Sequence, residues 1–194
     1  MIAGVILAAG ASSRLGSPKQ LLALQGRPLL QHVIDAAAVA GLDPIVIVLG
    51  HRAADVRAAL ALPDGASIVE NPDYAGGQAS SLRVGLASLP DAVAAAVVLL
   101  GDQPGIRPAV IDAAVERWQR ASGRVVRTVY RGRPGHPVVL DRAVWAEVMA
   151  ESGDRGARDV LAEHPEWIVP LERDEDAPAD VDMPGDYERL IGGS

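Results

Sequence analysis

The sequence predicts an α/β fold, a single three-layer α/β/α domain built on a mostly parallel, Rossmann-like sheet. Two observations lead to this prediction. Short apolar runs at residues 2–7, 44–49 and 94–100 are typical of strands that are buried on both faces. Segments of helical periodicity, such as 28–40 and 82–89, lie between them. This alternation implies parallel strands with helices on both faces of the sheet.

Local signals mark the individual elements. Pro28 suits the first turn of a helix, Gly41 ends that helix, and Ser80 and Ser81 can cap the next long one. The predicted strands lie at residues 2–7, 44–49, 67–70, 94–100, 125–130, 137–140 and 167–171. The predicted helices lie at 28–40, 55–60, 82–89, 108–121 and 142–150, followed by one that ends at Glu163 and a last one after residue 187. Because the run at 94–100 is the most continuously apolar, we expect it to form the central strand.

Composition excludes several classes of function. A length of 194 residues is enough for one α/β domain with a substantial core, and 49% hydrophobic residues is ordinary for a globular chain. A net charge of −7 argues against binding to nucleic acid or to an anionic membrane. The absence of cysteine excludes disulfides, thiolate catalysis and cysteine-bound zinc. With no membrane-length apolar run and no basic leader, we expect a cytoplasmic protein.

The segment from Leu7 to Gln20, L-A-A-G-A-S-S-R-L-G-S-P-K-Q, follows the first predicted strand. Open α/β sheets bind ligands at the carboxyl ends of their strands. Small residues such as Gly10, Ser12 and Ser13 leave backbone amides free to approach an anion, and Arg14 and Lys19 add two cations. The segment therefore predicts a polyphosphate site.

Two common phosphate loops do not fit this segment. A Walker loop needs lysine directly after its last glycine, whereas Ser17 and Pro18 separate Gly16 from Lys19. A dinucleotide fingerprint needs a glycine at position 12 and an acidic residue after the second strand, and neither is present. Lys19 is the only lysine in an arginine-rich chain, which favours a specific use of its compact charge.

Other candidate residues follow later strands, and each has a plain structural alternative. Asp102 in G-D-Q-P ends the predicted central strand, where a metal-bound triphosphate would lie, or it is a turn residue. The loop at 71–82 forms a second wall of the nucleotide site or a simple connection. The basic segment 131–137, which contains His136, either binds an anionic acceptor or is only a hairpin loop. The segment 153–158 likewise either binds the acceptor or only starts a helix. Asp180 or Asp182 completes a metal site, or Asp182 caps the last helix.

The pattern L-A-A-G-x-S-x-R-x-G-x-x-K resembles the signature of the nucleotidyltransferases that make sugar nucleotides, isoprenoid cytidylyl intermediates and molybdopterin dinucleotides. The segments G-D-Q-P, G-R-P-G-H-P and G-D-R-G-A-R narrow the resemblance to the MobA-like molybdenum cofactor cytidylyltransferase branch. Gln103 and Met183 depart from the methionine and threonine usual there. The resemblance implies a single domain, 1–194, with a nucleotide-binding part at 1–122 and an acceptor-binding part at 123–194.

The resemblance also assigns roles to residues of this chain. It implies catalytic roles for Lys19, Arg14 and Asp102, and Mg²⁺ binding by Asp102 and Asp182. Acceptor binding falls to His136, Arg155 and Arg158. The residues that the resemblance places at the nucleotide are Leu7, Ala8, Ala9, Gly10, Ser12, Ser13, Arg14, Lys19, Gly77 and Ser81, with Ser80 as an alternative to Ser81.

The implied reaction transfers CMP from CTP to the phosphate of molybdopterin cofactor and releases pyrophosphate. Alanine rather than glycine at position 9 goes with cytidylyl transfer in this group, because its methyl group would crowd a purine. Three alternatives stay open. They are a methylerythritol phosphate or sugar phosphate acceptor, a nucleotide-binding regulator without catalysis, and a structural interaction domain that does not bind nucleotide.

Overall fold

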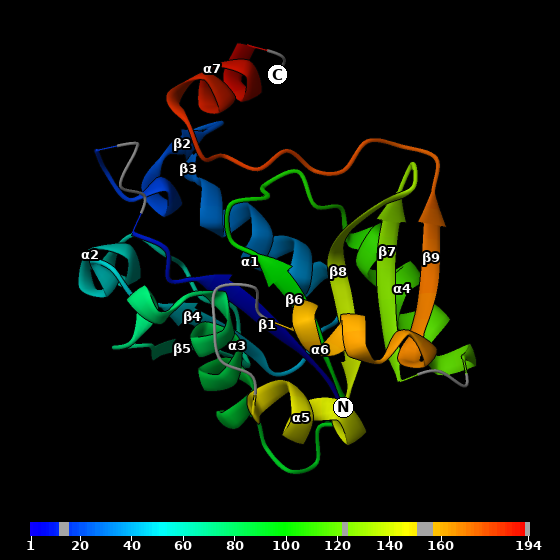
Figure 1. Cartoon of the computed structure of the whole chain (residues 1–194). Helices are drawn as coiled ribbons and strands as arrows, with labels where there is room; N and C mark the ends of the chain where they lie inside the picture. Colours follow the sequence, from blue (N-terminus) through cyan, green and yellow to red (C-terminus); the bar gives the residue numbers. More distant parts are fainter. Residues whose placement is uncertain (12–15, 122–123, 151–156, 193–194) are drawn as a thin grey trace.

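A seven-stranded sheet organises the computed structural model, which describes residues 1–11, 16–121, 124–150 and 157–192 (Figure 1). The strand order is β5-β4-β1-β6-β8-β7-β9, and only β8 runs antiparallel to its neighbours. The strands are β1 (Ile2–Ala8), β4 (Ile45–Leu49), β5 (Ala66–Glu70), β6 (Ala95–Leu100), β7 (Val125–Tyr130), β8 (Arg133–Asp141) and β9 (Ile168–Arg173). A separate two-residue pair, β2 (Ala23–Leu24) and β3 (Arg27–Pro28), precedes the first helix.

Helices cover both faces of the sheet, which confirms the predicted three-layer α/β/α fold (Figure 1). One core packs α1 and α4 on the sheet, and the other packs α3, α5 and α6 on the opposite face. The side chains of β1 alternate between them: Ile6 belongs to the first core and Val5 to the second. The helices are α1 (Leu29–Val39), α2 (Ala53–Ala58), α3 (Gln78–Ala87), α4 (Pro108–Arg120), α5 (Trp145–Ala150), α6 (Arg158–Glu163) and α7 (Pro184–Gly192). Single 3-10 turns lie at η1 (Lys19–Leu21), η2 (Tyr74–Gly76), η3 (Arg142–Val144) and η4 (Pro165–Trp167).

The parallel strands β1 and β6 end side by side at one edge of the sheet. Leu7 pairs with Leu100, and the amide of Gly101 donates to the carbonyl oxygen of Leu7 at 2.9 Å. A Cβ atom at position 101 would lie only 2.7 Å from the Cβ of Ala8. Glycine is therefore required for the two strand ends to approach, and it places Asp102 directly beside the loop after β1.

Three local predictions are wrong. Ser80 and Ser81 do not cap a helix, because α3 already begins at Gln78 and the side chain of Asn71 binds both hydroxyls, at 2.9 and 3.0 Å. The segment 131–137 is not a loop: the chain turns at Arg131–Gly132 with positive φ angles of 46° and 79°, and β8 begins at Arg133. The helix predicted over 142–150 is divided into η3 and α5.

Beyond β9 the chain returns across the carboxyl edge of the sheet to reach α7, which lies near β2 and β3 (Figure 1). The amide of Val181 donates to the carbonyl oxygen of Asp102 at 3.2 Å, and the Val181 side chain is buried with Leu24 and Leu29. The Tyr187 hydroxyl donates to the carbonyl oxygen of Ala23 at 2.6 Å. We call residues 174–183 the C-terminal strap. In the described part of the chain, none of the helices has the length and apolar character needed to cross a membrane.

Candidate active site

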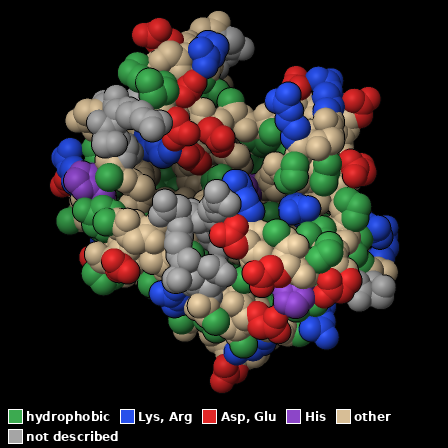
Figure 2. Space-filling model, in the orientation of Figure 1, with side chains coloured by type: hydrophobic (Ala, Val, Ile, Leu, Met, Phe, Trp, Pro, Cys, Tyr) green, Lys and Arg blue, Asp and Glu red, His purple; other side chains and the backbone are tan. Residues whose placement is uncertain are grey.

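Two adjoining cavities open at the carboxyl edge of the sheet, with volumes of about 420 and 250 Å³. Four residues line both of them: Leu7, Gln78, Leu100 and Asp102. The smaller cavity lies against the loop after β1 and the start of α3, and the larger one lies between β6, β8, α6 and the strap. Figure 2 shows this face hollowed, with acidic side chains gathered at its upper rim. Two ligands could therefore meet at Asp102.

Lys19 forms ion pairs at this site with two aspartates that are far from it in the sequence. Its ammonium nitrogen lies 2.5 Å from Oδ2 of Asp102 and 2.6 Å from Oδ1 of Asp182. The side chains of Lys19 and Asp102 are only 15% and 17% exposed, whereas Asp182 is 55% exposed. Burial by itself lowers the pKa of Lys19, but Asp102 and then Asp182 more than offset this and raise it above its ordinary value. The ammonium thus stays charged at neutral pH.

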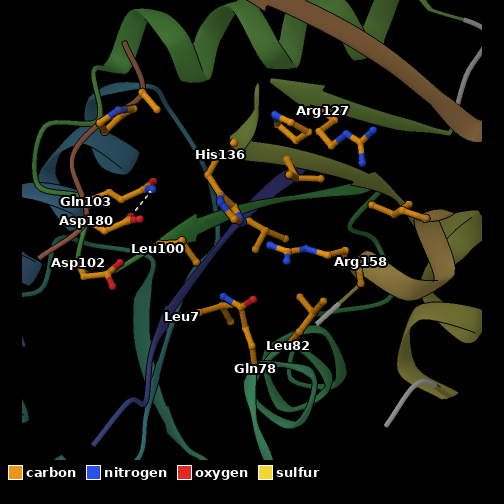
Figure 3. Close-up of a pocket in the computed structure, with 18 of the residues that line it drawn as sticks. Leu7, Gln78, Leu82, Leu100, Asp102, Gln103, Arg127, His136, Arg158 and Asp180 are labelled. Carbon is orange, nitrogen blue, oxygen red and sulfur yellow. Dashed lines mark hydrogen bonds between the residues drawn. The ribbon is translucent and has the colours of Figure 1, made fainter. Parts of the chain in front are cut away.

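Asp180 adds a third carboxylate beside Asp102 and Asp182, and we call these three residues the carboxylate wall. Its Oδ1 accepts a hydrogen bond from the amide of Gln103 at 2.7 Å (Figure 3). Burial raises the pKa of Asp180, and the charges of Asp102 and Asp182 add to this effect although the bond from Gln103 opposes it. The wall therefore presents three carboxyl groups to one ammonium group.

Those oxygen atoms suit a divalent cation, because Mg²⁺ takes one or two carboxylates and completes its shell with phosphate oxygens and water. Asp102 and Asp182 converge on one cationic centre in this structure, the Lys19 ammonium, which shows that both can face the same ion. Among the described residues, no three acidic or histidine side chains already surround a common point. A nucleotide would therefore have to supply part of the coordination. Metal binding by Asp102 and Asp182 stays a prediction.

The smaller cavity contains most of the residues predicted to bind the nucleotide. Its lining includes Leu7, Ala8, Ala9, Gly10, Lys19, Gly77 and Ser81. Ser12, Ser13 and Arg14 lie outside the described residues. The hydroxyl of Ser81 accepts a hydrogen bond from Asn71, so this residue also fixes the loop before α3 to its first turn.

Gln20 is a residue of this cavity that the sequence reasoning missed. It is 2% exposed, and its amide nitrogen donates to the carbonyl oxygens of Ala8 and Gly10 at 2.7 and 3.2 Å. These bonds tie Gln20 to the end of β1 and to Gly10. The amide oxygen of Gln20 is buried and has no hydrogen-bond partner among the described residues. A polar residue directly after Lys19 was the one signal in the sequence.

The larger cavity contains two of the three predicted acceptor residues, His136 and Arg158, whereas Arg155 lies outside the described residues. Burial, reinforced by the positive charge of Arg158, lowers the pKa of His136 to about 4, so its ring is neutral at pH 7. In Figure 3, Arg158 extends from α6 toward this ring. Arg127 of β7 lines the same cavity and was not predicted.

Comparison with known proteins identifies a family and several relatives. The family model of the MobA-like NTP transferase domain matches residues 4–167. The curated "Nicotine blue oxidoreductase" of Paenarthrobacter nicotinovorans is 36% identical over 98% of this chain and 96% of its own length. The structure of Rv0371C of Mycobacterium tuberculosis H37Rv in complex with manganese is 34% identical, with a TM-score of 0.84 over 100% of this chain and 99% of that one. A nucleotidyl transferase from Methanothermobacter thermautotroptrophicus is 25% identical, with a TM-score of 0.83 over 100% and 97%.

Proposed function

The chain belongs to the MobA-like NTP transferase family, and from this premise we propose that it transfers CMP from CTP to the terminal phosphate of molybdopterin cofactor. The observation that supports a transfer between two ligands is the pair of cavities that share Asp102 as a common border. The smaller cavity is suited to the nucleoside triphosphate and the larger one to the acceptor, whose phosphate would enter at the border.

In this reaction an oxygen of the acceptor phosphate attacks the α-phosphorus of CTP. The new P–O bond forms as the bond from the α-phosphorus to the bridging oxygen breaks, and pyrophosphate leaves with that electron pair. The nucleophile is already a phosphate oxygen, so no general base is needed. The residues act by positioning the two ligands and by neutralising charge.

The residues around the border between the two cavities would have separate roles in this reaction. Backbone amides near Ala9 and Gly10 and the Lys19 ammonium would hold the phosphates and stabilise the departing pyrophosphate. Asp102 and Asp182 would hold a divalent cation, which would supply charge neutralisation at the triphosphate. Lys19 would then turn from these carboxylates toward the phosphates. The family relative that binds manganese supports a divalent metal, and Mg²⁺ is our proposal for this chain.

The proposal that the base is cytosine rests on Ala9. This residue is buried in the lining of the smaller cavity, where its methyl group takes space that glycine would leave to a purine. This observation favours a pyrimidine nucleotide.

One relative has a name from another class of enzyme, and this gives a second candidate function. The protein named an oxidoreductase is 36% identical across almost the whole chain. The larger cavity, with Leu82, Val98 and Leu140 in its lining, could also accept an apolar, ring-shaped substrate. The chain nevertheless lacks a dinucleotide fingerprint after β1, which favours transfer over reduction.

The test is release of pyrophosphate with Mg²⁺ or Mn²⁺, using CTP, GTP, ATP and UTP in turn with molybdopterin, methylerythritol phosphate and a sugar phosphate. We expect release with CTP and molybdopterin, and loss of release in Asp102→Asn. Asp91→Asn, a change at a fully exposed carboxylate, is the matched control and should retain activity. Consumption of NADH with no pyrophosphate release would favour the oxidoreductase. CTP binding without turnover on any acceptor would favour a regulator.

A further inference from the structure

The larger cavity has walls of opposite charge. Asp102 and Asp180 lie on one side, and Arg127 and Arg158 lie on the other (Figure 3). The apolar residues in the lining include Leu82, Val98, Val138, Leu140 and Leu161. The reacting phosphate has to enter at the Asp102 border, so the arginine wall faces the opposite end of the acceptor.

A β-bulge shapes the arginine wall. Arg127 of β7 pairs with Val138 of β8, but the next residue, Thr128, pairs with Gly135, so His136 and Pro137 are inserted into β8. The Thr128 hydroxyl donates to the carbonyl oxygen of Pro137 at 2.7 Å, and the Tyr130 hydroxyl donates to that of His136 at 2.8 Å. These bonds fix the bulge, and His136 lines the cavity together with Arg127. Bulges of this kind are common beside active sites, where they re-aim side chains.

One nitrogen of the Arg127 guanidinium lacks an acceptor in the described part of the chain. Its Nε is buried and has no hydrogen-bond partner among the described residues. Within the described residues, no carboxylate forms an ion pair with either Arg127 or Arg158. His136 faces them as a neutral ring and contributes no negative charge. A buried N–H donor is normally hydrogen-bonded, so a group that binds beside Arg127 would supply the acceptor that its Nε lacks. Arg158 is exposed and lines the same cavity.

We propose that Arg127 and Arg158 bind an oxyanion group of the acceptor at the end remote from its reacting phosphate. This inference rests on the proposed function, because it assumes that the larger cavity holds the acceptor. It predicts that an acceptor with a second oxyanion opposite its reacting phosphate binds more tightly in this cavity than a matched molecule without one. A guanidinium binds such a group through two parallel N–H bonds, which a lysine cannot reproduce.

A matched pair of probes tests the proposal without turnover. Phenyl phosphate carries one anionic end, and 4-carboxyphenyl phosphate adds a carboxylate at the opposite end of the same ring. Their affinities are measured by calorimetry on the full chain, saturated with Mg²⁺ and a non-hydrolysable CTP analogue. We expect the wild-type protein to bind the carboxylated probe at least about tenfold more tightly, because a charge-assisted bidentate pair is added. In Arg127→Met this preference should fall to about onefold while phenyl phosphate affinity is unchanged.

Two further variants and a stability measurement separate binding from a structural role. Arg133→Met changes an exposed arginine of the same hairpin outside the cavity lining and should keep the full preference. Arg127→Lys keeps the positive charge but loses the two parallel N–H donors of the guanidinium, so it should retain only part of the preference. Since Nε of Arg127 has no partner to lose, the Tm of Arg127→Met should equal or exceed that of the wild-type protein.

Three results would overturn the inference. The first is a wild-type protein that binds both probes equally or binds neither, and the second is an Arg127→Met variant that keeps the preference. The third is a variant with a lowered Tm that weakens both probes alike. Pyrophosphate release is measured separately. Turnover without the probe preference refutes this inference alone, and the preference without turnover refutes the proposed function alone.

Discussion

Replacing Lys19 by methionine would remove the cation that holds Asp102 and Asp182 together while keeping a side chain of similar length. In the wild-type protein the ammonium lies 2.5 and 2.6 Å from the two carboxylates. Without it, these two groups and Asp180 would face one another as like charges. We therefore expect lower stability in the absence of metal.

The expected magnitude follows from the burial of each partner. Removing one member of a fully buried pair costs about 3–5 kcal/mol, and the pair of Lys19 with Asp102 is mostly but not fully buried, which reduces this to about 2–3 kcal/mol. Asp182 is 55% exposed and adds at most about 1 kcal/mol. The total of roughly 2–4 kcal/mol corresponds to a fall in Tm of about 4–16 °C for a domain of this size.

The assay is thermal unfolding by circular dichroism in EDTA and again with 1 mM Mn²⁺. The ion should raise the Tm of Lys19→Met more than that of the wild-type protein, because it does not have to displace an ammonium group. Arg27→Met is the matched control, since its ion pair with Asp35 is exposed on both sides, and it should cost less than about 1 kcal/mol. The double variant Lys19→Met with Asp102→Asn should lose less than the sum of the single losses.

The reasoning would be refuted by either of two results. One is a Lys19→Met variant that is as stable as the wild-type protein in EDTA. The other is strict additivity with Asp102→Asn, which would show that the two side chains do not interact in solution. A response to Mn²⁺ that is equal in both proteins would leave the ion pair intact and refute a shared site for metal and ammonium.

Three other changes give separate tests. Asp180→Asn should raise the Tm at pH 7, because burial raises the pKa of this carboxyl in the folded protein and so disfavours its charged form. The gain should fade as the pH falls toward the ordinary pKa of 3.8, since protonation removes the charge, and a gain that is independent of pH would contradict this. His136 has a folded pKa of about 4 against 6.5, so protonation favours the unfolded chain as the pH falls from 6.5 to 4, with a loss of at most about 3 kcal/mol. Urea unfolding of His136→Gln across this range should show a flatter pH dependence than the wild-type protein, and an equal slope would contradict the assignment. Gly101→Ala should cost about 1–3 kcal/mol in the same assay, because its methyl group would meet Ala8 at 2.7 Å, and an unchanged midpoint would show that the strand ends separate easily.

The sequence was sufficient to predict the layers of the fold and the edge of the sheet at which Lys19 and Asp102 meet, because both depend on local patterns. Apolar runs such as 44–49 and 94–100 identify strands buried on both faces, and parallel strands bring their carboxyl ends to one edge. Lys19 and Asp102 follow two such strands, so their meeting could be expected once β1 and β6 were taken as neighbours.

Other features depend on contacts that no local pattern encodes. Arg127 is one of many arginines, and its place in the cavity depends on a bulge in another strand. Gln20 acquires its role only when the loop after β1 brings the carbonyl groups of Ala8 and Gly10 around it. Ser80 and Ser81 are residue types that often cap helices. In the folded chain, however, the amide of Asn71 donates hydrogen bonds to both hydroxyls.

The strap has a consequence for the order in which the molecule is made. Lys19 and Asp182 are 163 positions apart in the sequence. Val181, whose amide donates to the carbonyl oxygen of Asp102, also comes after β9 in the chain. During synthesis the strands β1, β4, β5 and β6 emerge from the ribosome well before residue 182 does. A nascent chain can therefore assemble half of its sheet while the carboxylate wall is still incomplete. The proposed site for metal and triphosphate would therefore be completed only after the strands that carry it have been made.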